Sequence, residues 1–136
     1  MKTTNGEITG QQFFAGGAGQ GLPELEALYF IDENTGWLAG NVVVMKTTNG
    51  GNSFVDSMRI EVISTDMYFK DSQNGLISSY SGLIKRTTNG GVNWQSVRII
   101  NNGPLYDFNQ IAVVNDSVVW VGGKSIYKST NFGSTW

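Results

Sequence analysis

The chain has 136 residues, of which 40% are hydrophobic and 15% charged, and its formal net charge is −2. Histidine and cysteine are both absent, which excludes imidazole bases, thiolate nucleophiles, disulfides and Cys/His zinc sites for this chain acting alone. The nine Lys and Arg residues form no basic run, so nucleic acid is not expected as a partner. No apolar stretch reaches the roughly 18 residues of a membrane span, so no membrane span is expected.

Short strands separated by turns rich in glycine and asparagine are predicted along the chain. In the first complete unit, alternating apolar residues place strands over Leu28–Asp32, Trp37–Gly40 and Val42–Thr48, with a fourth beginning near Ser53. The Asn-Gly pair that starts at Asn49 supplies the positive φ values that a tight hairpin needs. The later strands are expected over Met67–Asp71, Leu76–Ser79, Leu83–Thr88, Asn93–Ile100, Gln110–Val114, Val118–Gly122 and Ser125–Thr130.

Two phrases recur along the chain at nearly constant distances. The first phrase occurs four times, in Lys2–Gly6, Lys46–Phe54, Arg86–Trp94 and Lys128–Trp136. From the first hydroxyl residue of one copy to that of the next, the distances are 44, 40 and 42 residues. The second phrase precedes three of these copies, in Tyr29–Trp37, Tyr68–Leu76 and, in a weaker form, Ala112–Trp120. Two phrases that recur in phase indicate a structural repeat of roughly forty residues.

Four short antiparallel strands in a unit of this length describe a blade of a β-propeller. We therefore predict an all-β fold with about three blades, either as part of a longer propeller or as one protomer of an oligomeric ring. A β-sandwich or a β-solenoid fits less well, because a sandwich has no reason to repeat its turns in phase and solenoid coils are usually shorter. The predicted units are residues 1–22 (the last two strands of a first blade), 23–62 and 63–103 (one blade each) and 104–136 (three strands and the start of a fourth).

The first phrase resembles the Asp-box, or bacterial neuraminidase repeat, whose pattern is Ser/Thr-x-Asp/Asn-x-Gly-x-Ser/Thr-Trp/Phe. The matching residues are Thr47, Asn49, Gly51, Ser53 and Phe54, then Thr87, Asn89, Gly91 and Trp94, and finally Ser129, Asn131, Gly133, Thr135 and Trp136. Asn93 replaces the hydroxyl residue of the second of these copies, and the copy at Lys2–Gly6 is degenerate. With the second phrase included, the repeat is most similar to that of photosystem II assembly-factor propellers.

The resemblance implies that the Asp-box lies away from any active site and has a structural role. Physical chemistry points the same way, because a short Asn side chain accepts hydrogen bonds from its own turn and glycine permits a positive φ. The aromatic residue at the end of the box is placed to pack between neighbouring sheets. The resemblance also implies a secreted or periplasmic location in bacteria, although the first ten residues contain no apolar segment of a signal peptide.

Carboxylates are the catalytic candidates that this composition leaves. Asp32 and Asp71 occupy the same turn position in successive units, where Asn115 stands in the third, and a repeated position indicates turn capping. Asp66 and Asp107 are less repetitive and lie near the start of an innermost strand, so they are the weak candidates for an acid/base pair of a glycoside hydrolase. No catalytic residue, cofactor or metal site is assigned.

The arginines do not match the site of a sialidase, which would need three of them around a substrate carboxylate. Arg86 stands where the other copies of the box have lysine, and Arg59 and Arg98 occupy equivalent positions of successive units. All three therefore look like residues of the repeat framework.

The regular repeat favours a non-catalytic binding or scaffold module that binds a protein or a glycan through a propeller face. The alternative is a fragment of an Asp-box glycoside hydrolase of the sialidase or endoglucanase type. Because a propeller ring must close to protect the edges of its sheets, we also expect a homo-oligomer that completes the ring, with a six-bladed dimer favoured.

Overall fold

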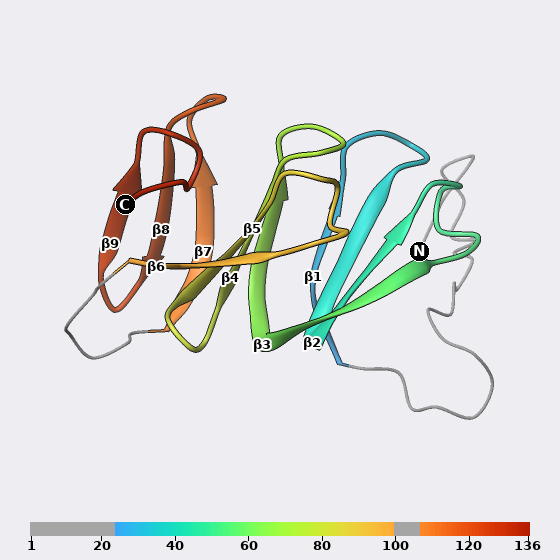
Figure 1. Ribbon diagram of the computed structural model, residues 1–136, viewed down its shortest axis with the longest axis horizontal. Helices are drawn as coiled ribbons and strands as arrows, with labels where there is room; N and C mark the ends of the chain where they lie inside the picture. The colour runs from blue at the N-terminus through green and yellow to red at the C-terminus, as the bar shows by residue number, and fades with distance from the viewer. Residues whose placement is uncertain (1–23, 100–106) are drawn as a thin grey trace, which may run out of the picture.

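The computed structural model describes residues 24–99 and 107–136, and within these ranges it contains antiparallel strands and no helix (Figure 1). The strands are β1 (Leu25–Phe30), β2 (Gly36–Thr47), β3 (Val55–Phe69), β4 (Gly75–Ser79), β5 (Leu83–Thr87), β6 (Gln95–Arg98), β7 (Phe108–Val113), β8 (Val119–Gly123) and β9 (Ile126–Ser129). The predicted all-β class is therefore confirmed.

The strands form three antiparallel sheets. In the first sheet, β2 pairs with β1 and with the start of β3. In the second sheet, the end of β3 is followed by β4, β5 and β6, and the third sheet consists of β7, β8 and β9. Because β3 belongs to two sheets, the hydrogen-bonded order runs from β1 to β6 without a break. Figure 1 shows the three sheets side by side, as blades of a propeller are.

Two strands bend at residues with left-handed backbone conformations. β2 folds back on itself near Val42, where φ is 58°, so that Leu38 pairs with β1 and Val44 pairs with β3 (Figure 1). β3 changes direction near Glu61, where φ is 55°, and passes from the first sheet into the second. The sequence predicts separate strands at both places. A β-branched residue such as Val42 rarely adopts a positive φ, so the pairing on both sides of the bend is what holds it there.

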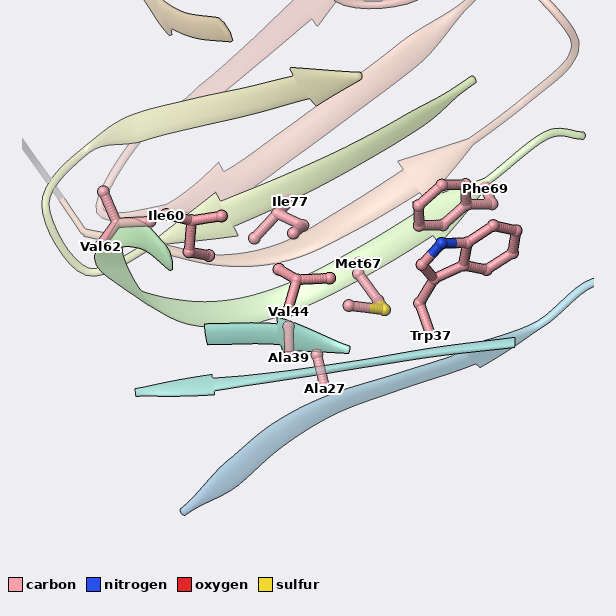
Figure 2. Packing of buried hydrophobic residues seen from close by; sticks show 9 residues of the cluster. All are labelled: Ala27, Trp37, Ala39, Val44, Ile60, Val62, Met67, Phe69 and Ile77. Carbon is pink, nitrogen blue, oxygen red and sulfur yellow. The ribbon is translucent and has the colours of Figure 1, made fainter. Parts of the chain in front are cut away.

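The core between the first and second sheets is built around a stacked aromatic pair (Figure 2). The rings of Trp37 on β2 and Phe69 at the end of β3 have centroids 3.6 Å apart and planes 6° apart, and Trp94 meets Phe69 edge-on at 5.9 Å. Such aromatic pairs are worth about 0.5–1.5 kcal/mol beyond the area they bury. The buried residues of this cluster are Ala27, Trp37, Ala39, Val44, Ile60, Val62, Met67, Phe69 and Ile77.

A second core joins the second and third sheets. Its buried residues are Leu76, Ile84, Phe108, Ile111, Val119, Val121 and Phe132. Neighbouring sheets thus pack face to face, each pair around a core of its own. The bounds predicted for the units 23–62, 63–103 and 104–136 stay predictions, and the predicted unit 1–22 lies outside the described residues.

Candidate functional site

The turn between β2 and β3 is closed by hydrogen bonds from the Asp-box residues. The Thr47 hydroxyl accepts the backbone N–H groups of Asn49 (3.3 Å) and Gly51 (3.0 Å) and donates to the side-chain oxygen of Asn49 (3.0 Å). That oxygen also accepts the N–H of Ser53 at 2.9 Å. Thr47 is fully buried, so its hydroxyl takes the place of water for these backbone donors.

The other two Asp-box turns repeat these contacts at 2.8–3.3 Å, through Thr87 and Asn89 in the second sheet and through Ser129 and Asn131 in the third. One contact differs between the copies. The side-chain amides of Asn49 and Asn131 also donate to a hydroxyl four residues later, whereas Asn93 occupies that place in the second turn. In all three boxes, the first hydroxyl and the side-chain oxygen of the asparagine therefore bond within their own turn.

The turn between the first and second strands of each sheet is capped by a short acidic or amide side chain. Asp32 accepts the N–H groups of the second and third residues after it at 2.8 and 2.7 Å, and these bonds hold its pKa below the usual value. Asp71 and Asn115 accept the equivalent N–H groups in their own sheets. Desolvation raises the pKa of Asp71, but the hydrogen bonds that it accepts outweigh this effect and leave it lowered. The capping role predicted from the repeated position is confirmed for all three side chains.

Asp66, one of the two weak catalytic candidates, joins the second sheet to the third. One carboxylate oxygen accepts the N–H of its neighbour Met67 at 2.8 Å, and the other accepts the N–H of Ile111 on β7, also at 2.8 Å. Beside it, the Thr65 hydroxyl donates to the carbonyl of Phe108 on the same strand at 2.6 Å. The sequence does not predict the bond between Asp66 and Ile111, because the two residues lie 45 positions apart. With both oxygens engaged by backbone donors, the Asp66 carboxylate acts as a clamp between sheets.

The second candidate, Asp107, is exposed and lies just before β7. Among the contacts of the described residues, none links it to Asp66.

Within residues 24–99 and 107–136 no group of three acidic side chains is placed to hold a metal ion. In the same part of the chain, no helix has the length and apolar character needed to cross a membrane.

In the second and third Asp-box turns, one backbone carbonyl accepts a hydrogen bond from the preceding sheet. The indole N–H of Trp37 donates to the carbonyl of Gly90 at 2.9 Å, and the Nε of Arg86 donates to the carbonyl of Phe132 at 3.0 Å. Gly90 and Phe132 occupy the same place in their boxes, so two different donors serve the same acceptor position. Arg86 therefore belongs to the framework that joins the sheets, as its position in the repeat predicts.

The edge of the sheets opposite the Asp-box turns exposes large side chains in the first and second sheets. Leu25, Ile63 and Tyr80 are 44%, 43% and 49% exposed, and we call these three residues the Tyr80 edge. They are neighbours along the backbone ladder, because Leu25 pairs with Gly40, the next residue Asn41 pairs with Ile63, and Tyr80 donates its N–H to the Ile63 carbonyl at 3.2 Å. In Figure 1 this edge lies at the bottom, where β2 bends and β4 turns into β5. Exposed apolar side chains on neighbouring residues at one edge are candidates for an interaction site.

Exposed carboxylates surround the Tyr80 edge. Glu24 and Glu26 flank Leu25, and Glu61 lies two residues before Ile63; all three are exposed. The carbonyl of Glu24 accepts the N–H of Asn41 at 3.1 Å, which ties the start of β1 to the bend of β2. An apolar strip with acidic residues at its margin suits a ligand that combines apolar and basic groups.

No protein-family model matches the chain, and no curated protein matches it significantly. Solved β-propeller structures do match its fold, which confirms the predicted propeller architecture. YCF48 bound to a D1 peptide has a TM-score of 0.69 and 21% identity, with 82% of this chain and 39% of that chain covered. YCF48 from Cyanidioschyzon merolae has a TM-score of 0.67 and 20% identity, with 82% and 35% covered.

A third structure, of an ancestral GH74 enzyme, has a TM-score of 0.69 and 20% identity, with 82% of this chain and 18% of that chain covered. At these identities the likeness establishes the fold. The chain spans less than two-fifths of the length of each of these three proteins.

Proposed function

We propose that this chain is a non-catalytic binding module that holds a peptide segment of a protein, or alternatively a glycan, at the Tyr80 edge. The observation that carries the proposal is that the two edges of the sheets differ: one repeats the same turns in every sheet, and the other does not. The Asp-box turns and the capped turns repeat from sheet to sheet with the same hydrogen bonds. The Tyr80 edge differs from sheet to sheet and exposes apolar side chains, as expected where recognition is grafted onto a repeated framework.

Two further points support binding over catalysis. The Asp66 carboxylate is engaged by two backbone N–H groups, which leaves the hydrolase alternative with Asp107 as its remaining candidate acid. Among proteins of similar fold, YCF48 has been solved with a D1 peptide bound. That peptide belongs to YCF48, and for this chain it supports only the general class of ligand.

The binding test uses fluorescein-labelled peptides in which Lys alternates with Leu or Tyr, compared with matched peptides that carry Glu in place of Lys. We expect the basic peptides to bind and the acidic ones not to bind. Tyr80→Ala should weaken binding by about tenfold or more, since exposed aromatic anchors dominate binding energies. The matched control is Val92→Ala, because Val92 is 55% exposed at the tip of an Asp-box turn on the opposite edge. Equal binding by both variants would contradict the Tyr80 edge as the site.

The same protein should be assayed for hydrolysis of sialosides and β-glucans, with Asp66→Asn and Asp107→Asn as controls. Hydrolysis that disappears in Asp107→Asn would establish the enzyme alternative and remove the proposal.

We also propose that the ring is completed by further copies of the chain, with a six-bladed dimer as the favoured form. That assembly is measured by the mass of the protein in solution and does not depend on ligand binding.

A further inference from the structure

The third sheet leaves exposed a tryptophan whose counterpart in the first sheet is fully buried. Trp37 and Trp120 occupy the same position, since each pairs with the first strand of its sheet, Trp37 opposite Tyr29 and Trp120 opposite Ala112. Trp37 is 0% exposed, whereas Trp120 is 36% exposed. On the same side of the third sheet, Ile126 is 72% exposed.

A lysine ammonium group lies over the ring of each tryptophan. The Nζ of Lys46 lies 5.1 Å from the ring centroid of Trp37, and the Nζ of Lys128 lies 5.4 Å from that of Trp120. A lysine over one ring face fixes the indole orientation and covers that face. Trp120 is thus arranged as Trp37 is, but the phenylalanine that stacks on Trp37 has no equivalent at Trp120 among the described residues.

The opposite end of the described chain exposes the equivalent of that phenylalanine. Phe69 lies against Gly75, where an added Cβ would come within 2.5 Å of its ring, and it stacks on Trp37 of the preceding sheet. Phe30 lies in the same way against Gly36, where an added Cβ would come within 2.6 Å. Phe69 is 1% exposed and Phe30 is 38% exposed. We call the contact between the first and second sheets, where Trp37 stacks on Phe69, the internal joint. The Phe30 ring therefore lies against its glycine as Phe69 does in the internal joint, where it receives a tryptophan.

The hydrogen-bond acceptor of the internal joint is repeated as well. The carbonyls of Gly90 and Phe132 accept side-chain donors from the preceding sheet, and each of these residues is held by a backbone bond from its own N–H at 2.8 Å. Gly50 occupies this place in the first Asp-box turn, with its N–H bonded to the carbonyl of Asn34 at 2.9 Å. The first sheet thus presents both the ring and the carbonyl that meet a tryptophan in the joint between the first and second sheets.

We propose that the side of the third sheet carrying Trp120, Ile126 and Lys128 docks on the side of the first sheet carrying Phe30 and Gly50 in a second copy of the chain. The Trp120 ring stacks on Phe30 of the partner subunit, and its indole N–H donates to the carbonyl of Gly50 of the partner subunit. The contact continues the interface that the first and second sheets already form within the chain. This inference rests on the proposed self-assembly and specifies the surfaces that carry it. Because the two surfaces differ, copies join head to tail, and a ring forms when the rotation between successive copies closes.

The test uses a pair of complementary variants, Trp120→Ala and Phe30→Ala, examined by size-exclusion chromatography with light scattering. Each variant alone should lose the self-association of the parent chain and elute with the mass of one chain. Mixed one to one, they should form a species of two chains, because Trp120→Ala keeps an intact Phe30 surface and Phe30→Ala keeps an intact Trp120 surface. Val92→Ala is the control and should assemble as the parent does.

Several outcomes would overturn the inference. A parent chain that stays monomeric at every concentration removes both the joint and the self-assembly. An oligomer that neither variant dissociates keeps the self-assembly and removes this joint. An oligomer broken by Trp120→Ala and untouched by Phe30→Ala indicates a two-fold contact between Trp120 surfaces instead. Since Ile126 is exposed in the single chain, Ile126→Lys provides a second variant that leaves the fold intact and should also dissociate the assembly. Peptide binding at the Tyr80 edge is measured separately, so its failure does not bear on the joint.

Discussion

Replacement of Asp66 by alanine distinguishes a clamp between sheets from a catalytic acid. The substitution removes both acceptors of the N–H groups of Met67 and Ile111, which belong to residues that are 4% and 9% exposed. A hydrogen bond to a charged group contributes about 1.5–3 kcal/mol, and because the carboxylate is only half-buried we take the lower value for each of the two bonds, a loss of about 3 kcal/mol. Asp66→Asn keeps one acceptor oxygen and should lose about half of that amount.

The measurement is urea denaturation followed by tryptophan fluorescence at neutral pH and a single protein concentration. With an m-value of about 1.5 kcal/mol/M for a chain of this size, the midpoint of Asp66→Ala should fall by about 2 M with the m-value unchanged. Asp107→Ala is the matched control, because the exposed Asp107 carboxylate should change the free energy of unfolding by less than about 0.5 kcal/mol. Equal midpoints for the two variants would refute the clamp.

Three further substitutions test the framework. Trp37→Phe keeps the stacked ring but removes the N–H that bonds to the next sheet, and it should lower the free energy of unfolding by about 1–2 kcal/mol in urea. Thr87→Val removes the hydroxyl that closes the second Asp-box turn and should cost about 2–3 kcal/mol, whereas the exposed neighbour Thr88→Val should change the thermal midpoint little. The folded state lowers the pKa of Asp71 below 3.8, so its stabilisation is complete above that pH and is lost as the pH falls through the folded value. Asp71→Asn, which copies Asn115, should fold at neutral pH and lose this part of the acid dependence, as acid titration of the fluorescence would show.

The sequence was sufficient for the features that depend on residues close together in the chain. Each Asp-box turn is closed by a hydroxyl and an amide that lie within four residues of the groups they bond, so the phrase itself carries the geometry. The capped turns at Asp32, Asp71 and Asn115 are local in the same sense. Both recur in phase, which is why the repeat identifies the fold without any knowledge of contacts between sheets.

Contacts between sheets could not be predicted in this way. The bond from Asp66 to Ile111 spans 45 residues, and the bond from Trp37 to the Gly90 carbonyl spans 53. Their formation depends on how the sheets are placed side by side, which no local pattern encodes. The sequence places a break between strands at Asn41, but it does not predict that Val42 adopts a positive φ, because that conformation contradicts the local preference of a β-branched residue and is held by pairing on both sides.

The joints between sheets show which positions of the repeat are free to vary. Between the first and second sheets, and again between the second and third, the acceptor is the carbonyl at the same position of the Asp-box. The donor is an indole in the first case and a guanidinium in the second, so this position needs a hydrogen-bond donor but not a particular residue. At the Tyr80 edge no such requirement acts, since the backbone bonds that hold Tyr80 and Asn41 are independent of side-chain identity. Substitutions at the joints should therefore change stability and assembly, whereas substitutions at the Tyr80 edge should change binding and leave the fold intact. This separation allows a repeated scaffold to present a surface that is not repeated.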